Sequence, residues 1–137
     1  MSDRMDTTLP ALAGCRILVV EDEMMIAMLI EDILGDHGCR IVGPASRVAV
    51  ALRLLAEEAV DIALLDVNLN GEDSYPIADE LARRGIPYVF ATGYGAGSVR
   101  LGYAPCAVLQ KPFDPAELCA CLADVAAKHV DSAGTRV

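Results

Sequence analysis

Five short apolar runs recur along the chain, and segments with a helical spacing of apolar residues separate them. This alternation constrains the fold more than any other feature of the sequence. The runs are 16–20, 40–44, 62–65, 86–91 and 107–109, and the helical segments are 23–36, about 46–58, 74–84 and 115–128. Strands that alternate with helices predict an α/β fold, in which helices cover both faces of a parallel sheet through right-handed crossovers.

The stretch from Gly93 to Gly102 interrupts this pattern. It holds four glycines in ten residues, so it predicts at most a short, marginal helix and the most mobile part of the chain. Its glycines match neither of the common nucleotide-binding motifs. We expect a flexible leader at 1–14, a folded domain at 15–130 and a short polar tail at 131–137.

Charge and composition exclude several classes of function. A net charge of −9, with 11 scattered Lys and Arg, argues against a nucleic-acid surface, since phosphate contacts need clustered basic residues. No apolar run is long enough to span a membrane, and the first residues lack the apolar centre of a signal peptide. The five cysteines are odd in number and form no CxxC motif, so we expect reduced thiols in a cytoplasmic protein.

Polar side chains follow four of the predicted strands. Glu21 and Asp22 come after the first strand, Asp66 after the third, Thr92 after the fourth and Lys111 two residues after the last. In a parallel sheet the carboxyl ends of the strands share one edge, where ligands bind. A single Asp after an apolar run is most often a turn former, but together these residues predict a site.

The residue types at this edge indicate metal-assisted phosphoryl chemistry. Three crowded carboxylates need a cation, and an all-oxygen site suits Mg²⁺ better than zinc. The backbone carbonyl of Asn68 lies close enough in sequence to Asp66 to complete the coordination. If Asp66 attacks a phosphoryl group, Mg²⁺ and Lys111 stabilise its oxygens and Thr92 donates a hydrogen bond to one of them.

With these residues in order, the chain resembles the receiver domains of two-component response regulators over roughly residues 15–129. The matching segments are Val19–Glu23, Leu65–Asn68, Ala91–Gly93 and Lys111–Phe113. Each motif is weak alone, whereas the set is highly specific. The resemblance implies a flavodoxin-like fold with strand order 2-1-3-4-5, and a cis peptide bond between Lys111 and Pro112.

The resemblance also implies roles for the residues of the site. Asp66 would be the phosphoacceptor, and Asp22 and the Asn68 carbonyl would bind Mg²⁺ with Glu21 nearby. Thr92 and Lys111 would be the switch residues. The implied partners are a sensor histidine kinase and an unknown downstream protein, and the protein itself would be a phosphoacceptor with self-catalysed phosphotransfer and autodephosphorylation rather than an enzyme acting on other substrates.

Two positions depart from the usual pattern of the family. Glu21 stands where Asp is more common, so its longer side chain changes how it reaches the metal. Val108 occupies the position of the usual aromatic switch residue. The run from Phe90 to Gly95 resembles an alphaproteobacterial subgroup of stand-alone receivers, in which the segment after the fourth strand replaces that aromatic residue, and Tyr94 is our candidate substitute.

Three functions stay open on the sequence alone. The first is a phosphorylation switch that signals through protein contacts or drains phosphoryl groups from a kinase. The second is a receiver fold that only binds a partner, which the intact residue set disfavours. The third is a small aspartate-nucleophile phosphatase, but such enzymes use a second acid two residues after the nucleophile, and Asn68 stands there.

Overall fold

The computed structural model describes residues 12–93, 99 and 107–133. Five strands of the main sheet, a two-stranded hairpin and four helices lie in these ranges. In chain order they are β1 Arg16–Val20, α1 Met24–Asp36, β2 Arg40–Ala45, α2 Val48–Glu57, β3 Ile62–Asp66, β4 Asn68–Leu69, β5 Glu72–Asp73, α3 Tyr75–Arg83, β6 Tyr88–Thr92, β7 Ala107–Gln110 and α4 Pro115–Ala133. The marginal helix considered for 93–102 falls largely outside the described residues.

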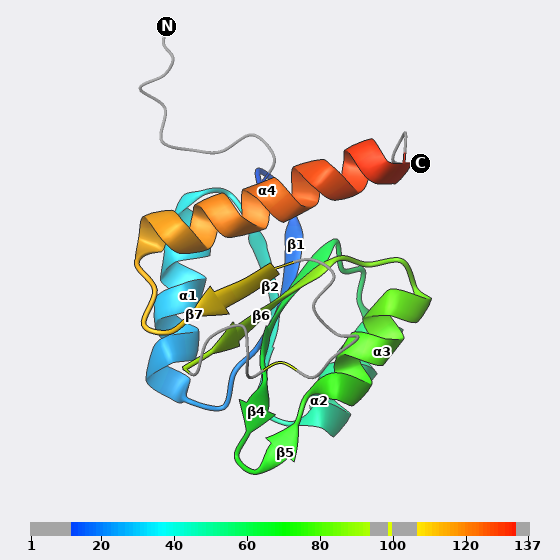
Figure 1. Cartoon of the computed structure of the whole chain (residues 1–137). Helices are drawn as coiled ribbons and strands as arrows, with labels where there is room; N and C mark the ends of the chain where they lie inside the picture. The colour runs from blue at the N-terminus through cyan, green and yellow to red at the C-terminus, as the bar shows by residue number, and fades with distance from the viewer. Residues whose placement is uncertain (1–11, 94–98, 100–106, 134–137) are drawn as a thin grey trace, which may run out of the picture.

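The main sheet is parallel and has the order β2-β1-β3-β6-β7. Because β4 and β5 form a separate antiparallel hairpin, this order is the predicted 2-1-3-4-5 arrangement. Helices α1 and α4 cover one face of the sheet, and α2 and α3 cover the other (Figure 1). The α/β fold expected from the alternation of strands and helices is therefore confirmed, as is the flavodoxin-like strand order that the family resemblance implies.

Strand β3 is buried on both faces because it lies in the middle of the sheet. Ile62 and Leu64 face the core under α1 and α4, while Ala63 and Leu65 face the core under α2 and α3. All four side chains are at most 2% exposed. An uninterrupted apolar run is the pattern that such a central parallel strand requires, and it carries Asp66 to the carboxyl edge.

Several local expectations were wrong. Leu12, assigned to the flexible leader, is fully buried in the core beneath α1 and α4. The helical spacing of apolar residues predicts that Leu29 lies on the buried face of α1, but Leu29 is 52% exposed, because the buried line of this helix runs through Ala27, Ile30 and Leu34. Serine is a preferred N-cap residue, so Ser46 is the cap that the sequence predicts for α2. The observed N-cap residue is instead Arg47, which forms no side-chain capping bond.

The last helix begins as predicted and ends later than predicted. Asp114 and Glu117 form a reciprocal capping box, with N–H to carboxylate distances of 2.7 and 3.1 Å. Helix α4 then runs to Ala133, past the expected end near residue 128 and into the predicted tail. No helix in the described part of the chain is long and apolar enough to cross a membrane.

Candidate functional site

The ends of β3, β6 and β7 bring three of the predicted site residues together. Asp66 is the last residue of β3 and pairs in register with Ala91 of β6, so Thr92 lies one position further along the adjacent strand. Lys111 follows β7, and its backbone N–H donates to the carbonyl of Thr92 at 2.8 Å. The peptide bond between Lys111 and Pro112 is cis, as predicted. Sheet register therefore fixes the relative positions of these residues.

Lys111 joins two carboxylates of the site. Its Nζ donates to Glu21 Oε1 at 2.8 Å and to Asp66 Oδ2 at 3.2 Å. The Glu21 side chain is 2% exposed and that of Asp66 is 13% exposed, so water screens these contacts only weakly. The second Glu21 oxygen, Oε2, accepts the backbone N–H of Glu23 at 3.1 Å. The ammonium group thus partly neutralises a largely buried pair of acids.

Burial dominates the protonation behaviour of the two acids. It raises the pKa of Glu21 from 4.5 to about 7 against the opposing hydrogen bond from Lys111, with the charge of Asp66 adding to the rise. Burial also raises the pKa of Asp66. For Lys111, burial lowers the pKa, but the hydrogen bond to Glu21 and the charge of Asp66 outweigh it, and the net pKa is raised. Burial thus disfavours the charged form of both acids, and the contacts with Lys111 offset it only in part.

The donor set of this cluster fits a hard divalent cation. Glu21, Asp22 and Asp66 each offer a carboxylate oxygen, and these oxygens lie within 4.8 Å of one another. The backbone N–H of Asn68 approaches Asp66 Oδ1 at 3.4 Å, which keeps the start of β4 beside the cluster. Oxygen donors without His or Cys match the preference of Mg²⁺. All four residues named from the sequence as metal ligands thus lie at one place.

The predicted switch residues fall into three groups. Thr92 is 3% exposed at the end of β6, next to the acidic cluster in the sheet register. Val108 pairs with Phe90 and packs, half-buried, against the core beneath α2 and α3. Tyr94 lies outside the described residues. Thr92 and the other predicted switch residue, Lys111, therefore both lie at the candidate site.

The residue types at 68–71 predict a loop, but the hairpin β4–β5 forms there. Asn70 and Gly71 adopt φ values of 56° and 92°, the left-handed backbone that a tight hairpin turn of type I′ needs at both central positions. Gly71 N–H donates to Asn68 Oδ1 at 2.9 Å, which closes the turn. The pair Asn70-Gly71 is a typical sequence signal for a hairpin turn. The strands on either side of it are too short to be recognised from the sequence. The hairpin projects beyond the main sheet, at the bottom of the view (Figure 1).

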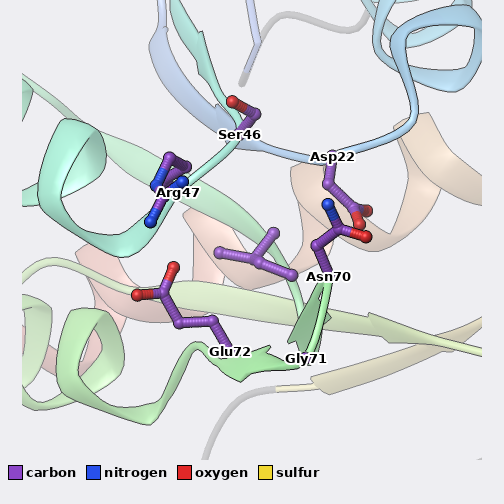
Figure 2. Close-up of a pocket in the computed structure, with 7 residues that line it drawn as sticks. Asp22, Ser46, Arg47, Asn70, Gly71 and Glu72 are labelled. Atoms are coloured by element: carbon purple, nitrogen blue, oxygen red, sulfur yellow. The ribbon is translucent and has the colours of Figure 1, made fainter.

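A polar pocket of about 510 Å³ lies beside the acidic cluster. Figure 2 shows residues from three connections around it: Asp22 after β1, Ser46 and Arg47 after β2, and the hairpin β4–β5. In this view the amide of Asn70 is directed toward the carboxylate of Asp22. The pocket was not anticipated from the sequence, because its walls come from segments that only the fold brings together.

The exposed surface of α1 carries an apolar patch next to the site. Large hydrophobic side chains with high exposure among the described residues all lie on this helix, namely Met24, Met25, Met28 and Leu29, hereafter the α1 patch. A groove of about 300 Å³ runs from Leu29 and Ile26 to Pro112 and Phe113, with Lys111 at its edge. Contiguous exposed apolar surface of this kind is typical of protein interaction sites.

The chain matches the family model of the response regulator receiver domain over residues 17–123. It is 34% identical over 109 residues to an uncharacterised transcriptional regulatory protein, YbdJ, of Bacillus subtilis, covering 77% of this chain and 48% of YbdJ. It is 32% identical over 80 residues to the transcriptional regulatory protein PdtaR of Mycobacterium tuberculosis, covering 58% of this chain and 39% of PdtaR. The chain thus spans about half or less of these curated relatives.

Solved structures show the same likeness. The solution structure of SdrG from Sphingomonas melonis is 44% identical, with a TM-score of 0.73 and coverage of 85% of this chain and 98% of SdrG. The response regulator TrrA from Thermotoga maritima, solved in complex with Mg²⁺ and BeF, is 25% identical, with a TM-score of 0.72 and coverage of 81% and 98%. Together with the match to the family model, these findings show that the chain belongs to the response regulator receiver domain family.

Proposed function

We propose that this receiver domain accepts a phosphoryl group on Asp66 in a Mg²⁺-dependent reaction. The observation that carries the proposal is the single cluster of three carboxylates and one ammonium group at the carboxyl edge of the sheet. Asp66 is the member that lies at the end of the central strand, with Lys111 on one of its oxygens. A carboxylate held in this way is suited to attack a phosphorus atom whose oxygens are neutralised by cations.

Mg²⁺ would be held by Asp22, Asp66 and the backbone carbonyl of Asn68, with Glu21 nearby. The ion would neutralise charge on the transferring phosphoryl group. In phosphoryl transfer the protein contributes mainly positioning and electrostatic stabilisation and little covalent chemistry. Support comes from the mutual proximity of the carboxylate oxygens. The receiver structure of TrrA in complex with Mg²⁺ and BeF gives further support from the same family.

Lys111 and Thr92 would respond to the new phosphoryl group. In the structure described here Lys111 binds Glu21 and Asp66, so a phosphoryl oxygen would compete with Glu21 for the same ammonium group. Thr92 would donate its hydroxyl hydrogen to a second phosphoryl oxygen. These new bonds would pull on the ends of β6 and β7, and we propose Tyr94 and Val108 as the residues that report the change.

The partners would be a histidine kinase that donates the phosphoryl group and a downstream protein that reads the switched state. The domain would signal through protein contacts or serve as a phosphate sink. The α1 patch supports protein binding close to the site, because it begins two residues after Asp22 and its apolar side chains are unusually exposed. No observation favours the phosphatase alternative, and Asn68 stands where such an enzyme would need its second acid.

The test is intact-protein mass after incubation with acetyl phosphate, with and without Mg²⁺, for the wild type and Asp66→Asn. The proposal predicts one phosphoryl adduct that needs Mg²⁺ and is lost in the variant, since the change keeps the shape of the side chain but removes the nucleophile. A purified histidine kinase loaded with phosphoryl groups serves as the second donor. Adduct formation in Asp66→Asn at the wild-type rate would contradict the proposal.

A further inference from the structure

The hairpin β4–β5 is clamped at its base next to Asp66. Asn68 N–H approaches Asp66 Oδ1 at 3.4 Å. At the other end of the hairpin, the fully buried Ser74 donates from its backbone N–H and from Oγ to the carbonyl of Val67, at 3.0 and 3.3 Å. The orientation of the hairpin therefore sets the direction of the backbone at Asn68, whose carbonyl we assign to Mg²⁺.

A second contact holds the far strand of the hairpin. The backbone N–H of Val48, the first residue of α2, donates to Glu72 Oε1 at 3.2 Å across 24 residues of sequence; we call this bond the tether. Helix α2 has no side-chain cap of its own, since its N-cap residue is Arg47. Glu72 therefore supplies from the hairpin the acceptor and the negative charge that a helix N-terminus ordinarily takes from a local residue.

Glu72, which accepts the bond of the tether, lines the polar pocket beside the acidic cluster. Figure 2 shows Glu72 and Arg47 on one side of this pocket and Asn70 beside Asp22 on the other. The hairpin thus reaches from the N-terminus of α2 to the acidic cluster. No described part of the main sheet pairs with β4 or β5. The buried side chain of Leu69, the clamp at the base and the tether therefore hold the hairpin beside the cluster, and the tether is the contact that joins its far strand to α2.

We propose that Glu72 is a positioning residue for the metal site. By tethering the hairpin to α2, it holds the Asn68 carbonyl and the Asp66 carboxylate in the arrangement that Mg²⁺ binds. This inference rests on the proposed function, in which the Asn68 carbonyl is a ligand. Glu72 is exposed and contributes one hydrogen bond, so its loss loosens the site without dismantling it, and we expect a change of Mg²⁺ affinity of roughly threefold to tenfold.

The decisive comparison is between Glu72→Gln and Glu72→Ala. Both variants lose the same charge near the cluster, but only Gln keeps an oxygen that can accept the Val48 N–H. Glu57→Ala, which removes an exposed acid at the far end of α2, controls for net charge. The measurements are the Mg²⁺ dissociation constant by calorimetry without phosphodonor, and hydrogen exchange of the Val48 amide without metal.

The proposal predicts that Glu72→Ala binds Mg²⁺ at least threefold more weakly than Glu72→Gln and exchanges the Val48 amide faster, while Glu57→Ala resembles the wild type. Equal affinities of the Gln and Ala variants would overturn it, because charge alone would then explain the effect. The intact-mass assay for a phosphoryl adduct on the wild type tests the proposed function separately. If the wild type forms the adduct but the two Glu72 variants bind Mg²⁺ with equal affinity, only the positioning role of Glu72 is refuted. The proposed function then stands.

Discussion

The pKa of Glu21 predicts how the stability of the metal-free protein depends on pH. Burial raises this pKa from 4.5 to about 7 in the folded protein, and unfolding restores the ordinary value. The folded state therefore binds the proton more tightly than the unfolded state. The resulting contribution to stability is fully present below about pH 4.5 and is lost as the pH rises through about 7.

The size of this loss follows from the distance between the two pKa values. At about 1.4 kcal/mol for each pH unit, the full contribution of Glu21 is about 3 kcal/mol. Between pH 5 and pH 8 the expected loss is about 2 kcal/mol. The pKa of Asp66 is also raised, by burial before any other cause, so the wild-type profile contains more than one titration. Glu21→Gln removes one of them, and the difference between the two profiles isolates it.

The assay is urea unfolding followed by circular dichroism, with EDTA present, at a series of pH values for the wild type and Glu21→Gln. The free energy of unfolding of the variant, relative to the wild type, should rise by about 2 kcal/mol from pH 5 to pH 8. The relative stability of the variant can only rise with pH through this effect, because the amide of Gln at position 21 never ionises. A relative stability that stays constant with pH, or that falls, would refute the assignment of a buried, partly protonated Glu21.

Three further predictions concern the site, its neighbouring surface and the last helix. Lys111→Met should slow adduct formation from acetyl phosphate about a hundredfold, because it removes a cation from the transferring group; an unchanged rate in the same mass assay would contradict this role. Met25→Glu should slow phosphotransfer from a histidine kinase but not from acetyl phosphate, and equal slowing with both donors would argue against the α1 patch as a docking surface. Asp114→Ala should lower the free energy of unfolding by about 1 kcal/mol through loss of the capping box, with no change in adduct formation; unaltered urea unfolding would show that the cap contributes nothing.

The site could be predicted from the sequence because the geometry of a parallel sheet places the residues that follow its strands at one edge. Once β3 was identified by its apolar run, Asp66 had to lie at the carboxyl edge, and the same reasoning placed Glu21, Thr92 and Lys111 there. Parallel strands leave no other arrangement for residues that follow their ends. The order of strands, by contrast, came from the family resemblance, since alternation alone permits several orders.

Other features depend on contacts that a linear pattern does not encode. The exposure of Leu29 and the burial of Leu12 follow from which line of α1 faces the sheet and from the path of the chain before β1. The raised pKa of Glu21 requires knowledge of its burial, not only of its neighbours. The tether between Glu72 and α2 joins segments 24 residues apart, and neither segment carries a signal that points to the other.

The most direct measurement is the chemical identification of residue 66 after phosphorylation. Borohydride reduces an aspartyl phosphate to homoserine, so the protein is incubated with acetyl phosphate and Mg²⁺, reduced, digested and analysed by peptide mass spectrometry. We expect homoserine at position 66, and we expect it to disappear when Mg²⁺ is chelated. An unmodified Asp66 in protein that nonetheless carries a phosphoryl group, or homoserine at another position, would contradict this expectation.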